Sequence, residues 1–191
     1  MKIIPRYGHF NWIAPFYDRV FGAMDHDALF AHLAAAPGDV ALDIGGGTGR
    51  VAQRLRGLGV QVIVVDPSPG MLRHARIKGL PAARALAERL PFAGDSIDRI
   101  YIVDAFHHFA QQKEAALDLV RILRPGGRLV IEEPDLRRLA VKFVALAEKA
   151  ALMQSHFYSP PALADLFIAA GAELVAITPD RISAHVALTK S

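Results

Sequence analysis

The sequence predicts an α/β fold in which a doubly wound, mostly parallel sheet is covered by helices on both faces. Two observations carry this prediction. First, short β-branched and apolar runs alternate with segments of helical periodicity along most of the chain, which is the pattern of strands joined by helical crossovers. Second, the apolar run at residues 40–44 leads directly into Gly45, Gly47 and Gly49, a spacing that is typical of a buried strand turning sharply into a helix.

The elements are expected in chain order, each on a local signal. Strands are indicated by short β-branched runs, and helices by apolar residues at helical spacing or by a glycine that stops them. The run at 97–103 is the strongest strand signal, and Ala115, Leu119 and Ile122 share one face of a helix. The expected strands lie at 40–44, 60–65, 82–86 (weak), 97–103, 128–131, 173–177 and 184–189, and the expected helices at 48–58, 69–78, 111–123 and 160–170.

Turn residues separate the later elements. Pro125, Gly126 and Gly127 predict a turn before the strand at 128–131, and Gly171 stops the helix at 160–170. The last two strands are joined only by a short loop containing Pro179 and Asp180. Because this loop leaves no room for a helical crossover, we expect the two strands to pair as an antiparallel hairpin.

Composition restricts the class of protein. The 191 residues form a single expected domain, 1–191, with a real core, since 52% of them are hydrophobic. The absence of cysteine excludes disulfides and thiolate metal sites and fits a cytoplasmic location. No signal peptide or transmembrane segment is expected, although peripheral membrane contact stays open. The net charge is only +3 and the arginines are scattered, so no nucleic-acid partner is expected.

Two segments stand outside the alternation of strands and helices. Residues 1–36 predict an N-terminal helical cap and contain the aromatic residues Phe10, Trp12, Phe16, Tyr17 and Phe21. Residues 135–159 form an insertion with apolar residues at helical spacing. Because ligands of open α/β sheets bind beyond the carboxyl ends of the strands, both segments are candidates for a lid over a substrate. The alternative is that they simply complete the core.

The glycine-rich turn indicates the kind of ligand. Bare backbone at Gly45, Gly46 and Gly47 lets a ligand lie against the main chain. The dinucleotide fingerprint G-x-G-x-x-G is incomplete, because Arg50 stands at its third glycine. A carboxylate at Asp43 would repel a pyrophosphate but suits an ammonium group, which favours S-adenosylmethionine. Asp66, at the end of the second strand and followed by Pro67, can accept hydrogen bonds from ribose hydroxyls. The alternatives are a cap of the glycine turn for Asp43 and a helix N-cap or solvated acid for Asp66.

Five motifs occur in one order along nearly the whole chain: Leu42 to Gly49, Val65 to Ser68, Ala87 to Phe92, Asp104 to Phe109, and Leu123 to Leu129. In these motifs the chain resembles the class I S-adenosylmethionine-dependent methyltransferases, and among them the ubiquinone/menaquinone-type, UbiE-like branch. The resemblance implies a Rossmann-like, seven-stranded sheet of order 3-2-1-4-5-7-6 with strand 7 antiparallel. It also implies S-adenosyl-L-methionine as cofactor, S-adenosyl-L-homocysteine as product, and in-line methyl transfer to a small, apolar or lipid-like acceptor.

The resemblance adds further binding residues. Asp104 would contact the methionine end of the cofactor, and Tyr17 would close over the cofactor, unless Tyr17 is an ordinary core aromatic and Asp104 a solvated strand-end acid. Relatives carry an aspartate for the adenine amino group where this chain has Leu86. Adenine would then be held by packing, by the Ala87 N–H or by the carboxylate of Glu88.

The catalytic group is not determined by the sequence. His107 and His108 follow a strand that ends at the expected cleft, where a neutral imidazole could take a proton from an acceptor; Tyr17 is a third candidate, and structural packing is the alternative. The eight histidines lack a metal-binding motif, so no metal site is expected.

Two other functions stay open. A nicotinamide-dependent oxidoreductase is disfavoured by Asp43 and the missing third glycine, whereas a non-catalytic module that binds S-adenosylmethionine or S-adenosylhomocysteine is favoured slightly by Leu86. The sequence identifies neither the acceptor nor the oligomeric state.

Overall fold

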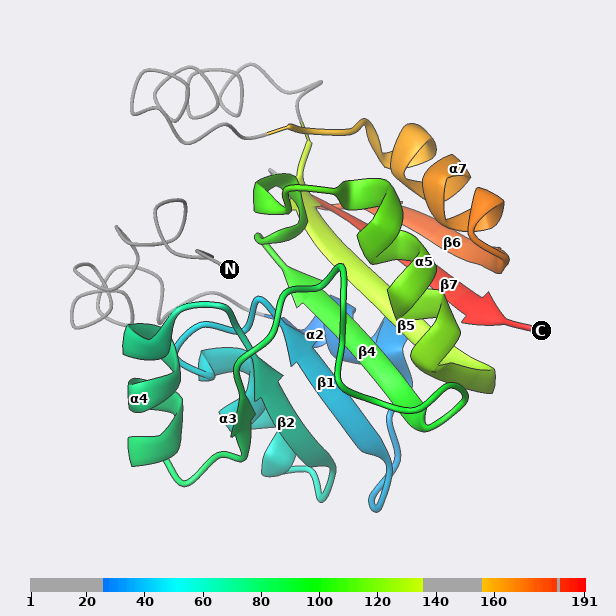
Figure 1. Cartoon of the computed structure of the whole chain (residues 1–191). Helices are drawn as coiled ribbons and strands as arrows, with labels where there is room; N and C mark the ends of the chain where they lie inside the picture. The colour runs from blue at the N-terminus through cyan, green and yellow to red at the C-terminus, as the bar shows by residue number, and fades with distance from the viewer. Residues whose placement is uncertain (1–25, 136–155, 182) are drawn as a thin grey trace.

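Seven strands form one sheet in the order β3-β2-β1-β4-β5-β7-β6 (Figure 1). The computed structural model describes residues 26–135, 156–181 and 183–191. Within them the strands are β1 Val40–Ile44, β2 Gln61–Val65, β3 Ala82–Ala83, β4 Ile97–Val103, β5 Leu123–Pro134, β6 Ala172–Pro179 and β7 Ser183–Lys190. The helices are α2 Asp27–Leu33, α3 Arg50–Arg56, α4 Pro69–Ile77, η1 Phe106–His108, α5 Gln112–Ile122 and α7 Pro160–Ala169.

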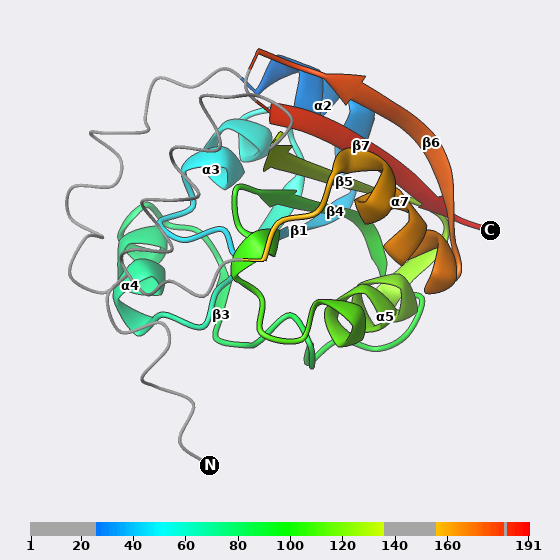
Figure 2. The same ribbon diagram turned by 90° about the horizontal axis from the view of Figure 1, so that it is seen from above.

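The predicted topology is confirmed. Strands β3, β2, β1, β4 and β5 are parallel, whereas β7 is antiparallel to both β5 and β6. Leu42 and Ile44 of β1 point into one core layer together with residues of α5 and α7. Ala41 points into the other layer, with residues of α2, α3 and α4. Figure 2 shows α2 and α3 on one side of the sheet and α5 on the other. Alternate side chains of each strand thus enter opposite layers, as in a doubly wound fold.

Three of the differences from the predicted boundaries have a local structural cause. The predicted strand 128–131 is the centre of the longer β5, which begins before the predicted turn: Leu123 pairs with Ile97, and pairing resumes at Arg128, so residues 124–127 bulge out of the strand instead of ending it. The third strand is only Ala82–Ala83, because the chain turns back at Leu86. Helix α3 begins at Arg50 rather than Thr48, because Gly49 has a φ of 74° and cannot be part of the helix.

The two segments expected to form a lid are described only in part. Of the N-terminal cap, residues 26–36 are described and contain α2; residues 1–25, with Tyr17, lie outside the described residues. Of the insertion, Asp135 and residues 156–159 are described. The lid and the extent of the single domain therefore stay predictions. Among the described residues, no helix has the length and hydropathy that a membrane crossing requires.

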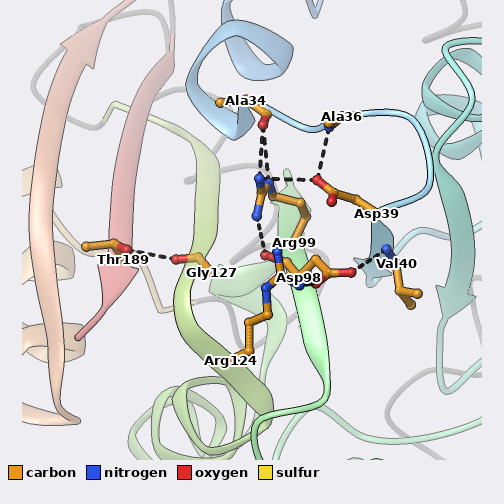
Figure 3. A network of polar contacts seen from close by, with 9 residues as sticks. All are labelled: Ala34, Ala36, Asp39, Val40, Asp98, Arg99, Arg124, Gly127 and Thr189. Atoms are coloured by element: carbon orange, nitrogen blue, oxygen red, sulfur yellow. Dashed lines mark hydrogen bonds and ion pairs between the residues drawn. The ribbon is translucent and has the colours of Figure 1, made fainter.

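The amino-terminal ends of β1 and β4 are held by a polar network around Arg99 (Figure 3). The Arg99 guanidinium donates to the carbonyl of Ala34, at 3.3 Å from Nε and 3.2 Å from Nη2, and pairs with Asp39 at 3.1 Å. Asp98 accepts from the Val40 N–H at 2.7 Å and pairs with Arg124. These contacts attach the carboxyl end of α2 to the edge of the sheet opposite the glycine loop.

Candidate functional site

The glycine loop joins β1 to α3 at the carboxyl edge of the sheet. The Gly45 N–H donates to the Val65 carbonyl at 2.7 Å, which ties the loop to β2. Gly45, Gly47 and Gly49 have φ values of 71°, 56° and 74°, a region that glycine enters without strain. A Cβ on Gly45 would lie 2.6 Å from the Cβ of Ala105, and one on Gly49 would lie 2.4 Å from Leu80 Cδ1. The glycines are therefore needed both for the turn and for the packing beneath it.

Asp66 connects the end of β2 to this loop. Its Oδ2 accepts from the Gly47 N–H at 3.1 Å, and its Oδ1 accepts from the Ser68 N–H at 2.7 Å. Burial raises the pKa of Asp66 to about 6, although these two hydrogen bonds favour the carboxylate. The N-cap of α4 is Ser68, whose hydroxyl accepts from Met71, so Asp66 is not a helix cap. Pro67, beside Asp66, accepts from Arg84 Nε through its carbonyl at 3.1 Å.

Asp43 lies on the inner side of the glycine loop. Its side chain is buried, and its carboxyl occupies the space that a Cβ on Gly46 would need, with Cγ 2.3 Å from that position. Burial raises the pKa of Asp43 to about 7. Tyr101, the β4 neighbour of Asp43 in the sheet, is fully buried beside it. An acid with this pKa can change its charge near neutrality when a cation or a polar ligand approaches.

The end of β4 turns through a left-handed residue. Asp104 is exposed, has a φ of 52° and donates its N–H to the Glu132 carbonyl at 2.9 Å. A positive φ is costly for a residue with a side chain, and such strain often marks a functional turn. The next two N–H groups, of Ala105 and Phe106, both donate to Glu133 Oε1, at 2.9 and 2.8 Å. Glu133 therefore holds the loop for which the family resemblance implies a contact to the methionine end of the cofactor.

The structure also brings His107 to Glu133. His107 Nδ1 lies 2.6 Å from Glu133 Oε2, in a buried contact. The His107 ring stacks on Phe157 with a centroid distance of 4.3 Å, and the His108 ring lies 4.0 Å away. Sequence reasoning proposed both histidines but missed Glu133. The sequence could have indicated Glu133, because it is an acid at the end of β5. A parallel sheet places that end beside the end of β4.

Ala87 and Glu88 lie in the turn after β3. Ala87 is buried, and the turn is closed by the Arg89 N–H donating to the Leu86 carbonyl at 3.1 Å. Glu88 Oε1 accepts from the N–H groups of Ala110 and Gln111, at 3.0 and 3.1 Å, just before α5. This carboxylate oxygen thus serves the amino end of a helix, where negative charge is stabilising. Within the described ranges, no group of three or more histidine and acidic side chains is placed to hold a metal ion.

A glycine loop, an acid at the end of the next strand and a seven-stranded sheet with this order define a class of protein, the Rossmann-like nucleotide- and nucleoside-binding enzymes. Residues 42–131 match a family described as a methyltransferase domain. Residues 42–131 therefore carry a methyltransferase domain, and this match confirms the resemblance to S-adenosylmethionine-dependent methyltransferases.

Three similar proteins illustrate the relationship. An uncharacterized methyltransferase of Mycobacterium bovis is 41% identical over 91 residues, which are 46% of this chain and 37% of that protein. A demethylmenaquinone methyltransferase of Mycobacterium sp. is 35% identical over 103 residues, 54% of this chain and 45% of that protein. A Thermotoga maritima crystal structure, described as an S-adenosylmethionine-dependent methyltransferase and possible histamine N-methyltransferase, is 25% identical with a TM-score of 0.78. The match covers 97% of this chain and 100% of the Thermotoga chain. The chain spans less than half the length of the two mycobacterial relatives.

Proposed function

We propose that the protein binds S-adenosylmethionine on the Gly45–Gly49 loop and transfers its methyl group to a small, apolar or lipid-like acceptor. The observation that carries this proposal is the arrangement of the carboxyl edge of the sheet. The glycine loop and two buried carboxylates lie at the ends of β1 and β2, and a hydrogen-bonded histidine–glutamate pair lies at the ends of β4 and β5. Cofactor and acceptor would thus meet at adjacent strands.

The residues of this edge fit the cofactor. Asp43 Oδ2 is a buried oxygen without a hydrogen-bond partner among the described residues, next to the bare backbone of Gly46. Its charge suits the ammonium group of the ligand, directly or through water. Asp66 would accept from the ribose hydroxyls, and the loop around Asp104 would face the methionine end. Adenine would lie against the turn of Ala87, with packing by Leu86 in place of a hydrogen bond.

His107 is the proposed proton acceptor. When bound, the cofactor supplies an electrophilic methyl group on a sulfonium whose leaving group is a neutral thioether. A neutral His107 that donates to Glu133 through Nδ1 has its lone pair on Nε2. That nitrogen would take the proton of an acceptor hydroxyl, and the Glu133 carboxylate would stabilise the resulting imidazolium. His108, whose ring contacts that of His107, is the second candidate.

The class of acceptor is supported by two observations. A relative that is 35% identical over 54% of this chain is named demethylmenaquinone methyltransferase. In addition, the Phe157 ring stacks on His107 and provides an apolar wall beside the proposed base. A hydroquinone or phenol hydroxyl has a pKa of about 10, like that of tyrosine, so an imidazole can assist its reaction as a general base.

The test combines binding with turnover. Calorimetry should show one S-adenosylhomocysteine per chain, with little binding of NAD. Labelled methyl transfer from S-adenosylmethionine should then be measured with demethylmenaquinol, a simple phenol and histamine, and transfer to the first is expected to be fastest. Preferential binding of NAD would overturn the proposal. Tight binding of S-adenosylhomocysteine without turnover on any of the three acceptors would favour a non-catalytic binding module.

A further inference from the structure

A second cluster of polar side chains lies on the sheet face opposite to His107 and Glu133. We call it the α2-face cluster. Five of its members are at most 5% exposed, and Arg50 is half-buried. Burying so many polar groups is unfavourable unless they bond to one another or to a ligand. The cluster comprises His26 before α2, Asp43 of β1, Arg50 of α3, Tyr101 of β4, Glu132 of β5 and His185 of β7.

Arg50, His26 and Glu132 are joined by a series of hydrogen bonds in which each residue donates to the next. Arg50 Nη1 lies 2.9 Å from His26 Nε2, and because a guanidinium can only donate, Nε2 is the acceptor. The proton of a neutral His26 is then on Nδ1, which lies 3.2 Å from Glu132 Oε2. Arg50 therefore donates to His26, and His26 donates to Glu132.

Glu132 is held as a carboxylate at the end of this series. Burial opposes its ionisation, but the imidazoles of His185 and His26 lower the pKa of Glu132 to about 2. His185 Nε2 lies 3.5 Å from the same oxygen that His26 contacts. A buried carboxylate is a strong acceptor, so it holds His26 in the Nδ1–H tautomer and leaves Nε2 for Arg50.

Arg50 connects this series of hydrogen bonds to the glycine loop. It is the first residue of α3 and directly follows Gly49, whose φ is 74°. The Arg50 charge also acts on Asp43 beneath the loop: burial raises the pKa of that carboxyl, and Arg50 opposes the shift. Four buried side-chain atoms lack a hydrogen-bond partner among the described residues, and all four belong to the α2-face cluster: Asp43 Oδ2, Arg50 Nε, Tyr101 Oη and His185 Nδ1.

We propose that His26 and Glu132 are positioning residues for the cofactor, which hold Arg50, and through it the first turn of α3 and the Gly45–Gly49 loop, in the conformation that binds S-adenosylmethionine. Neither residue needs to touch the ligand. The unpartnered atoms around Asp43 leave the buried side chains beneath the loop without a full set of hydrogen bonds, and Arg50 joins these side chains to the first turn of α3. This inference rests on the proposed function, because the loop is the proposed cofactor site.

Calorimetric titration with S-adenosylhomocysteine tests the inference. His26→Leu replaces the imidazole with an apolar side chain of similar size and removes both hydrogen bonds. It should weaken the binding of S-adenosylhomocysteine tenfold or more. His26→Gln should stay within threefold of the parent, because one amide can accept from Arg50 and donate to Glu132. The matched control is Arg99→Ala, which removes an arginine contact to α2 at the opposite edge of the sheet. It should lower stability but keep the parent affinity.

The outcomes separate this inference from the proposed function. If the parent binds and His26→Leu binds equally well, or loses no more affinity than Arg99→Ala, the positioning role is wrong while the cofactor site stands. If the parent does not bind, both are wrong. Should His26→Leu fail to fold, ¹⁵N spectra of the parent's histidines decide. The Nδ1–H tautomer of His26 is expected, with a shift on addition of S-adenosylhomocysteine, and the Nε2–H tautomer would overturn the inference.

Discussion

Glu132 and Glu133 are consecutive residues of β5, yet their carboxylates lie on opposite faces of the sheet, and each contacts a histidine. Glu132 contacts His26 at 3.2 Å beneath α2, and Glu133 contacts His107 at 2.6 Å beside η1. The alternation of side chains along a strand separates the two pairs. One strand end thus serves both the anchor of the glycine loop and the pair that we propose for proton transfer.

Glu133→Gln should reduce methyl transfer far more than stability. The glutamine oxygen can still accept from the two backbone N–H groups, but an amide can no longer stabilise a protonated His107. We expect kcat to fall by a factor of about 100, in the usual range for general base catalysis, with little change in the affinity for S-adenosylhomocysteine.

Glu133→Ala is the companion variant. It leaves the buried donors of Ala105, Phe106 and His107 without an acceptor, and should lower the free energy of unfolding by about 3 kcal/mol. Urea denaturation and single-turnover assays measure the two effects. Parent-like turnover in Glu133→Gln would remove His107 and Glu133 from the chemistry.

Asp66→Ala should weaken S-adenosylhomocysteine binding tenfold or more. The change removes the charged acceptor that we propose for two ribose hydroxyls, each hydrogen bond being worth about 1.5–3 kcal/mol. It also removes the Gly47 contact that shapes the loop. Isothermal calorimetry measures the loss. The control is Asp27→Ala, whose carboxylate is 77% exposed and pairs with Arg54 on the surface, and which should bind like the parent. Unchanged affinity in Asp66→Ala would exclude Asp66 from the site.

Leu86→Asp should restore an acceptor for the adenine amino group. The Leu86 side chain is half-buried and its turn is closed through the backbone, so the substitution should leave the turn intact. The gain is expected to be about 1 kcal/mol, the net worth of one neutral-donor hydrogen bond. An S-adenosylhomocysteine analogue without the amino group should not share this gain. If parent and variant discriminate equally between S-adenosylhomocysteine and the analogue, adenine does not lie against Leu86.

Stability should fall as the pH rises toward neutrality, because of Asp43. Burial raises its pKa in the folded protein from 3.8 to about 7, so between these values the folded state binds more protons than the unfolded state. By linkage, this contribution to stability is full below the unfolded pKa and is lost as the pH rises through the folded pKa. Asp66, with a pKa raised to about 6, adds to the same trend.

Asp43→Asn is the variant that tests this pH dependence. It should be more stable than the parent at pH 8, by up to about 4 kcal/mol, and should lose much of the decline between pH 4 and pH 8. It should also bind S-adenosylhomocysteine more weakly, because it lacks the charge that we propose for the ammonium group of the ligand. Urea titrations at both pH values measure the first effect and calorimetry the second. An identical pH profile in parent and variant would show that Asp43 keeps an ordinary pKa.

Local patterns were enough to predict the individual strands and the glycine loop. The strands β1 and β4 have the predicted bounds, and the hairpin of β6 and β7 is antiparallel as expected. These features depend on neighbours in the chain: β-branched runs favour strands, and glycines at alternate positions permit the φ values of the turn. The order of the strands came from the family resemblance rather than from the residues themselves.

Side-chain partners were decided by the tertiary structure alone. Glu88 was a candidate for adenine, yet its Oε1 accepts from the N–H groups before α5, and Glu133 and His26 were not singled out at all. Glu133 contacts a histidine 26 positions away in the chain, and His26 contacts a glutamate 106 positions away. Such pairs depend on the register of β5 against β4 and β7 and on the face to which each side chain points. Neither can be read from a local pattern, because a shift of one residue would exchange Glu132 and Glu133 between the two faces.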